Sequence, residues 1–373
     1  MLLRIPDFYD SFHCIANKCT DTCCVGWEID IDKTSLKRYA NVEGEFGDRL
    51  RQDIEDGHFK LLEGDRCPFL RQDGLCDMIC HLGESSLCNI CREHPRFVEV
   101  YGDIMEKGIG LCCEEAVRLL LTAHETTQSP IAFIEREIED TPDNIPDDAR
   151  EARDIIFEER DQLFKIIADR SRPLNERLIE MLDFAVETSG IEIDEPDETL
   201  IEKTKVITQL HKNSNSTDNI LNIILRSWIK ILGKGESFGP AWDTAYKELS
   251  QIDLASCTHD ASSTGQGVGL FSENDGAKII AYLLYRYYAK SLFDGNSLTK
   301  VEFAIFFWIM LEKFGDTFAS ATGSTPNSKI AAVKLLSKQT EYSEEIMSIL
   351  EQEFMENPLF SPQNFKILLK EKK

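Results

Sequence analysis

The residues best suited to chemistry in this sequence are cysteines, and they gather at one end of the chain. Eleven of the twelve cysteines lie before residue 114, and the twelfth, Cys257, stands alone. Thiolates at short separations can converge on one soft cation or metal cluster at little cost in loop entropy. The concentration therefore predicts a metal or redox site, whereas an isolated cysteine is typical of a small buried hydrophobic residue.

The spacing of these cysteines suits either zinc or an iron–sulfur cluster. Cys19 and Cys23, together with Cys88 and Cys91, could supply the two closely spaced pairs that structural zinc sites favour. Cys67 is followed by a proline, and a Cys-Pro dipeptide also occurs in the ligand runs of ferredoxins. The residues alone leave both metals open.

Two established cluster motifs are incomplete in this sequence. The plant-type ferredoxin spacing would need a cysteine where Thr22 stands. The motif of radical S-adenosylmethionine enzymes would need a third cysteine where Gly26 or Gly83 stands. We therefore expect no radical chemistry.

Net charge and hydropathy limit which partners the protein can bind and which compartment it is expected in. A formal net charge of −25 argues against binding nucleic acid through its phosphate backbone. Residues 1–10 lack the basic start and apolar run of a signal peptide, which predicts the reducing cytoplasm, where clustered cysteines are more often metal ligands than disulfides. The apolar run Phe303 to Leu311 is too short to span a membrane and predicts a buried helix.

The elements that must position the cysteines fall into two parts. We expect a mostly α protein: a cysteine-rich cluster region of short irregular elements over residues 1–125, packed on a helical region over 126–373 that completes the site. Residues 155–167 show helical periodicity. Further helices are expected at about 218–232, 238–250, 274–293, 299–314, 329–338, 342–355 and 362–370, with another ending near 210.

Strands and loops are less prominent in the pattern. Trp27 to Ile31 alternates apolar and acidic residues and could form one strand edge. The acidic runs Glu135 to Asp140 and Asp147 to Asp161 are expected to be solvated faces of helices. Residues 213–219 and 257–269 are expected to be surface loops.

Several blocks in the first third of the chain carry a resemblance. They are FHCIANKCTDTCCVGW (12–27), CPFL (67–70), DGLC (73–76), LCxxCRxxPR (87–96) and CEEA (113–116). Through them residues 8–121 resemble the flagellin lysine-N-methylase (FliB) family, and the first block is also similar to the broader group of CxxCxxxCC-type cluster proteins. A weaker similarity lies in residues 279–288, IIAYLLYRYY.

The resemblance implies a cytoplasmic enzyme that transfers methyl groups from S-adenosylmethionine to lysine side chains of flagellin, and that holds a [4Fe-4S] cluster. It places the family's cysteines at Cys14, Cys19, Cys23, Cys24, Cys67, Cys76, Cys91 and Cys113. Because one cubane takes four thiolates, eight positions imply either a second metal or structural cysteines.

Methyl transfer from a sulfonium needs a deprotonated lysine aligned with the methyl carbon, and it needs no metal. We therefore expect a structural cluster. The only glycine-rich candidate for a cofactor loop, GQGVG at 265–269, does not follow a buried strand, so the cofactor site is expected to be built from helices and cysteine-rich loops.

Candidate site residues flank the cysteine blocks or share the aromatic helix. The candidates for binding the cofactor are Asp21, Trp27, Arg96 and Arg286, and the candidates for receiving the lysine are Tyr282 and Tyr285. Either arginine could pair with the cofactor's carboxylate. The alternative for each is a structural role in the core. His13, His81 and His94 are near cysteines, but we expect them at the surface or behind the ligands.

Two other functions fit the same residues. One is a non-catalytic iron–sulfur or zinc protein that binds or assembles other components, which would not bind S-adenosylmethionine. The other is a redox protein, for which the sequence offers no flavin or nicotinamide motif.

Overall fold

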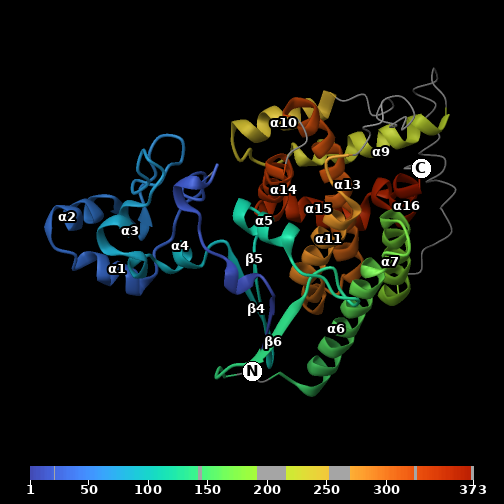
Figure 1. Ribbon diagram of the computed structural model, residues 1–373, viewed down its shortest axis with the longest axis horizontal. Coiled ribbons are helices and arrows are strands. Elements are labelled where there is room, and N and C mark those ends of the chain that lie inside the picture. The colour runs from blue at the N-terminus through green and yellow to red at the C-terminus, as the bar shows by residue number, and fades with distance from the viewer. Residues whose placement is uncertain (21, 142–144, 191–215, 252–268, 323–325, 371–373) are drawn as a thin grey trace.

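The computed structural model describes residues 1–20, 22–141, 145–190, 216–251, 269–322 and 326–370. Figure 1 shows a smaller lobe that carries helices α1 to α4 and projects from a larger body of strands and helices. Most of the described elements are helical, so the prediction of a mostly α protein is confirmed. The expected helix near residue 210 and most of the loop expected at 257–269 lie outside the described residues.

The lobe is built from short elements around a small core. It contains α1 (Lys33–Ala40), α2 (Gly44–Gln52), a two-stranded hairpin of β2 (Ile54–Glu55) and β3 (His58–Phe59), α3 (Asp77–Leu82) and α4 (Asn89–Glu93). Phe69 lies at its centre, with its ring centroid 5.1 Å from that of Phe59. Trp27 to Ile31 is not a strand, because Asp30 alone forms an isolated bridge, to His58.

A single carboxylate ties the first helix of the lobe to the cysteine loops. Asp32 caps α1, since one of its oxygens accepts the Ser35 amide at 2.9 Å. Its other oxygen accepts the Asn89 amide at 2.9 Å, at the start of α4. Tyr39 adds a second link, because its hydroxyl donates to the Ser86 carbonyl at 2.7 Å. These bonds fix the 86–91 segment against α1.

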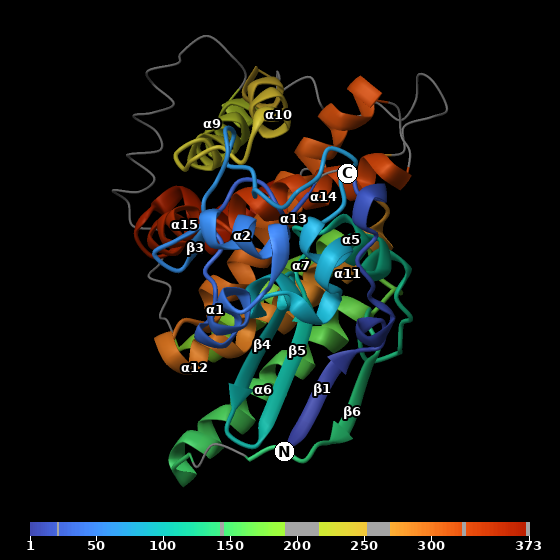
Figure 2. The same cartoon turned by 90° about the vertical axis from the view of Figure 1, so that its left-hand side faces the viewer.

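The body contains a four-stranded sheet. Its strands are β1 (Leu2–Pro6), β4 (Arg96–Tyr101), β5 (Ile104–Ile109) and β6 (Phe133–Glu137). They lie side by side in the order β4-β5-β1-β6 (Figure 2), with β1 parallel to β5 and antiparallel to β6. The sheet crosses the boundary expected at residue 125, because β6 alone comes from the second part.

The expectation that residues 135–140 form a helix face is wrong. Residues 133–137 are instead the edge strand β6, paired with β1 so that Glu135 lies opposite Arg4. The Arg4 guanidinium lies 3.6 Å from the Glu135 carboxylate. The acidic side chains of this strand are mostly exposed. An exposed edge strand can therefore be as rich in acidic residues as the solvated face of a helix, and composition does not distinguish the two.

Eleven helices of the described chain complete the body. They are α5 (Glu114–Thr122), α6 (Asp147–Ala168), α7 (Leu174–Ser189), α9 (Ser216–Leu232), α10 (Pro240–Gln251), α11 (Glu273–Tyr287), α12 (Ser291–Asp294), α13 (Ser297–Thr322), α14 (Pro326–Glu341), α15 (Glu344–Glu356) and α16 (Pro362–Lys370). The helical face expected within Asp147–Asp161 is confirmed by α6. Residues 303–311 of α13 are all buried, as expected. In the described chain we find no helix both long and apolar enough to cross a membrane.

Helix α11 is the buried centre of the body. Ser272 and Asp275 form a capping box at its start, which satisfies its first amides. The Tyr285 hydroxyl lies 2.7 Å from the Arg4 carbonyl oxygen and 3.0 Å from that of Lys107, so it joins the helix to β1 and β5. The sheet and α6 are joined by a buried ion pair between Glu106 and Arg160, with distances of 2.8 and 2.5 Å.

Candidate functional site

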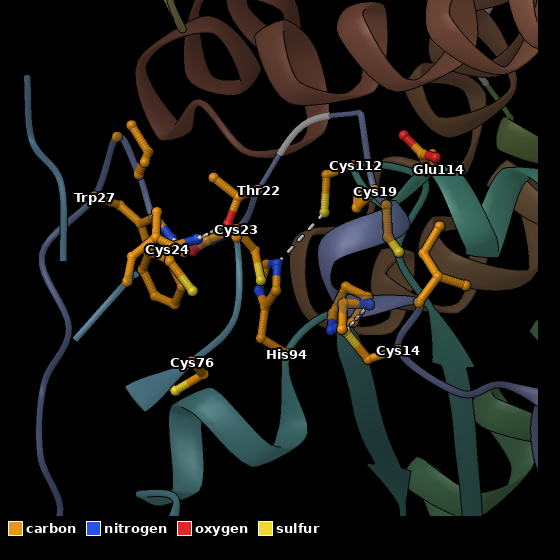
Figure 3. Close-up of a pocket in the computed structure, with 18 of the residues that line it drawn as sticks. Cys14, Cys19, Thr22, Cys23, Cys24, Trp27, Cys76, His94, Cys112 and Glu114 are labelled. Atoms are coloured by element: carbon orange, nitrogen blue, oxygen red, sulfur yellow. Dashed lines mark hydrogen bonds between the residues drawn. The ribbon is translucent and has the colours of Figure 1, made fainter. Parts of the chain in front are cut away.

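A cavity of about 500 Å³ opens between the lobe and the body. Its cysteines are Cys14, Cys19, Cys23, Cys24, Cys76, Cys80, Cys112 and Cys113. The body contributes Phe238 and, from α14 and the residue after it, Lys334, Lys338 and Tyr342. Figure 3 shows the labelled thiols arranged on either side of His94.

One group of thiols belongs to the core of the lobe. We call Cys24, Cys67, Cys76, Cys88 and Cys91 the lobe thiols, because all five pack in that hydrophobic core. The Cys67 amide donates to the Cys24 carbonyl at 2.9 Å, which sets these two residues side by side. Leu70 and Cys76 form a bridge that closes the loop after Cys67. Tight backbone pairing therefore gathers the lobe thiols from four sequence blocks.

A second group gathers at the start of α5. We call Cys14, Cys19, Cys23 and Cys113 the α5 thiols, because Cys113 is the residue before that helix and the other three line the cavity with it. Glu114 accepts the Thr20 amide at 2.9 Å and its hydroxyl at 2.5 Å. These two bonds hold the loop that carries Cys14 and Cys19 against the first turn of α5.

Neighbouring thiols influence each other's ionisation. A hydrogen bond from Cys23 lowers the pKa of Cys24 to about 7, and one from Cys91 lowers the pKa of Cys88 to about 7. Burial raises the pKa of Cys67 to about 12. One thiol of each close pair is therefore disposed to become a thiolate at neutral pH, the form that binds metals.

The donor set fits a thiophilic metal group better than a single ion. Among the described residues, no three His, Cys, Asp or Glu side chains lie close enough to hold one metal ion as they stand. Zinc would draw four sulfurs to about 2.3 Å from itself. An iron–sulfur cluster is larger than a single zinc ion, so the thiols that hold it lie farther apart. Such clusters are held by soft sulfur ligands. The eleven described cysteines all carry free thiols, so none is lost to a disulfide.

Three aromatic rings form one wall of the cavity. The His94 ring lies 5.2 Å from Trp27 and 6.1 Å from Tyr342, centroid to centroid. Burial, helped by Lys338 and Arg286, lowers the pKa of His94 to about 4, so its imidazole is neutral at pH 7. Its Nε2 lies 3.8 Å from the Cys112 sulfur. The wall therefore combines aromatic faces with a neutral base.

A buried polar cluster supports Tyr342 from behind. The Arg286 guanidinium donates to the Tyr282 hydroxyl at 2.7 Å, the Glu341 carboxylate at 3.2 Å and the Tyr342 hydroxyl at 3.4 Å. Tyr282 and Tyr287 each donate to the same Glu341 oxygen at 3.1 Å. These side chains do not line the cavity, and they position the residue that does.

The structure separates the residues expected to form the site. Trp27 and Arg96 line the cavity. Tyr282 and Arg286 lie behind its wall, and Tyr285 is bonded to the sheet outside the cavity. Asp21 lies outside the described residues.

His94 and Tyr342 were not singled out as site residues by the sequence. His94 lies within the CRxxPR block, and its position between Cys91 and Arg96 was a usable signal. Tyr342 directly follows α14, and no motif in the sequence marks it as a site residue. It reaches the cavity only because α14 packs beside it in the folded protein.

Comparison with known proteins gives relatives for part of the chain. The chain is 30% identical to the flagellar biosynthetic protein FliU of Salmonella muenchen over an alignment of 126 residues. This alignment covers 31% of the chain and 75% of FliU. The chain is 29% identical to the lysine-N-methylases of Salmonella typhimurium and Salmonella choleraesuis over 130 residues, which are 31% of this chain and 31% of each enzyme. The match thus spans about a third of those two relatives. No family model and no solved structure matches the chain.

Proposed function

The chain belongs to the FliB family, and from this we propose that it is a protein-lysine N-methyltransferase that uses S-adenosylmethionine and acts on flagellin. The observation that carries the proposal is the cavity, which joins an aromatic wall and a neutral imidazole to cationic side chains at one place. Aromatic faces can attract a sulfonium, cationic side chains can pair with a carboxylate, and an imidazole nitrogen can accept a hydrogen bond from an amine.

Each feature has a chemical task. When bound, S-adenosylmethionine supplies an electrophilic methyl carbon on a sulfonium. The ring faces of Trp27, His94 and Tyr342 would attract that positive charge. Arg96 and Lys338 line the same cavity and would pair with the donor's carboxylate.

The lysine must lose a proton before its nitrogen can bond to the methyl carbon and displace the sulfur. A lysine in water has a pKa of about 10.4, and removal from water favours its neutral form. The proton is released to water before the amine enters the cavity, because an imidazole with a pKa of about 4 is too weak a base to take it. We assign His94 the task of accepting a hydrogen bond from the neutral amine and so orienting its nitrogen. The rings that line the cavity would shield the amine from water.

We include a [4Fe-4S] cluster of structural role in the proposal, held by the cysteines of the lobe. No electron moves in methyl transfer, so the cluster's contribution is to fix the loops that carry Trp27 and His94. The support is the donor set: five thiols from four sequence blocks meet in one small apolar core.

The test uses protein purified without oxygen and incubated with flagellin and methyl-labelled S-adenosylmethionine. Peptide mass spectrometry should find whole methyl additions on flagellin lysines, and label should be absent when the donor is omitted. A metal-bearing protein that neither binds the donor nor transfers label would instead be the non-catalytic binding or assembly protein.

A further inference from the structure

We propose that the chain holds two separate thiolate metal centres: a lobe centre on Cys24, Cys67, Cys76 and Cys91, and an α5 centre on Cys14, Cys19, Cys23 and Cys113. The inference deepens the metal-binding part of the proposed function and does not depend on methyl transfer. It assigns every cysteine that the family resemblance implies, four to each centre.

The first step is that the two groups are anchored in different cores. The lobe thiols pack in the hydrophobic core around Phe69, where Cys67 is 5% exposed. Cys113 instead packs against the main core of the body, formed by α5 and the helices around it. A ligand set divided between two rigid cores cannot collapse onto one centre without moving one core against the other.

The second step is that each group is closed by its own hydrogen bonds. The lobe group is closed by the Cys67–Cys24 backbone bond and by the Leu70–Cys76 bridge. The α5 group is closed by the bonds of Thr20 to Glu114. Neither set of bonds includes a residue of the other group. The two groups meet at the hydrogen bond between the consecutive thiols of Cys23 and Cys24.

The third step is that His94 lies between labelled thiols of the two groups. In Figure 3, Cys24 and Cys76 lie on one side of His94, whereas Cys14, Cys19 and Cys112 lie on the other. Cys23 and Cys24 are consecutive, and they are the point where the two groups meet. The dipeptide gives one thiol to each centre, which explains why it is doubled.

Both centres would take a soft, thiophilic metal group, either an iron–sulfur cluster or zinc, because all eight donors are cysteine sulfurs. A cubane and a structural zinc both accept four thiolates. Cys88 lies in the lobe core as a fifth sulfur, and Cys112 lies beside His94, so neither is required for the count of four. The metal content distinguishes the two possibilities for each centre.

The experiment measures iron, sulfide and zinc in the full chain purified without oxygen, with electron paramagnetic resonance of the reduced protein. The variants are Cys76→Ser for the lobe centre, Cys14→Ser for the α5 centre, and the double variant. The matched control is Cys80→Ser, an exposed cysteine that lines the same cavity and belongs to neither centre. Circular dichroism reports whether each variant is folded, and Cys91→Ser and Cys19→Ser replace any that is not.

Two centres predict that the wild type holds about eight iron atoms, about four iron atoms with one zinc, or about two zinc ions. Each single variant should lose one centre and keep the other, the double variant should lose both, and the control should lose neither. A wild type with metal for one centre only, or a single variant that is folded but wholly metal-free, would overturn the inference. Methylation does not enter these readings: two centres without label transfer would refute only the proposed function.

Discussion

His94 and His81 show how two histidines next to cysteine blocks come to lie in different surroundings. Both follow a cysteine block, but His94 lines the cavity, whereas His81 stacks on Phe46 with ring centroids 4.3 Å apart. The pKa of His94 is lowered because burial disfavours its charged form. The sequence could place both near cysteines and could not rank them, since burial depends on contacts with α14.

Replacing His94 should therefore reduce turnover without unfolding the protein. His94→Phe keeps a ring between Trp27 and Tyr342 and removes the nitrogen that would orient the amine, so we expect kcat to fall by about 100-fold. Metal content should not change. Single-turnover methylation measures the effect, and His81→Phe is the matched control. Equal activities of the two variants would remove His94 from the mechanism.

A second prediction concerns the buried ion pair between Glu106 and Arg160. Arg160 is fully buried, so Glu106→Gln leaves a charge without its counterion, and we expect the free energy of unfolding to fall by about 3–5 kcal/mol. The double variant Glu106→Leu with Arg160→Met should recover most of this loss. Urea unfolding measures both. A single variant as stable as the wild type would show that the pair is not essential.

At the scale of elements, helices were far easier to predict than strands. The helices expected at 342–355 and 362–370 match α15 and α16 to within two residues, because their periodicity is local. The four-stranded sheet was not expected, although β4 and β5 alternate around a turn at Gly102, which adopts φ +72°. That signal was present in the sequence and went unused. Strand β6 is recognisable only from its pairing with β1, which is more than a hundred residues away.

The cap of α1 gives a prediction with a defined pH dependence. Hydrogen bonds from the Asn89 and Ser35 amides lower the pKa of Asp32 to about 2. Since the pKa is lowered on folding, the stabilisation is fully present above the unfolded value, near 3.9, and is lost as pH falls towards 2. Asp32→Ala should cost about 1 kcal/mol.

The difference in stability between wild type and Asp32→Ala should be the same at pH 7 and pH 5, measured by urea unfolding at each pH. Asp32→Asn, which keeps an oxygen acceptor, is the control and should lose less. A difference that already shrinks between pH 7 and pH 5 would show that another group governs the cap.

At the scale of the whole molecule, the lobe and the body differ in the size of their cores. The lobe core is small and includes five cysteines, whereas the body is packed around α11 and α13. A small core is marginal without a metal or disulfide. The division into a cysteine-rich part and a helical part could be read from composition, but the shared sheet could not.

Removing the metal should therefore unfold the lobe first. After chelation, hydrogen exchange should become fast in α1 to α4 and stay slow in α11 and α13. The measurement is exchange mass spectrometry on the full chain before and after chelation. Loss of protection throughout the chain, or none in the lobe, would contradict this division.

The position of β1 in the sheet sets an order of assembly during synthesis. Residues 2–4 pair with residues 104–106, so the first strand emerges from the ribosome about a hundred residues before its partner. The lobe, with Cys24 to Cys91, is complete in that interval, while Cys113 is not yet made. At about 5–20 residues per second, the 22 residues from Cys91 to Cys113 take about 1–4 seconds to make, and during that time the lobe thiols are already present. Under the two-centre proposal, metal can therefore reach the lobe before β1 pairs with β5, whereas the α5 group can be filled only once Cys113 has been made.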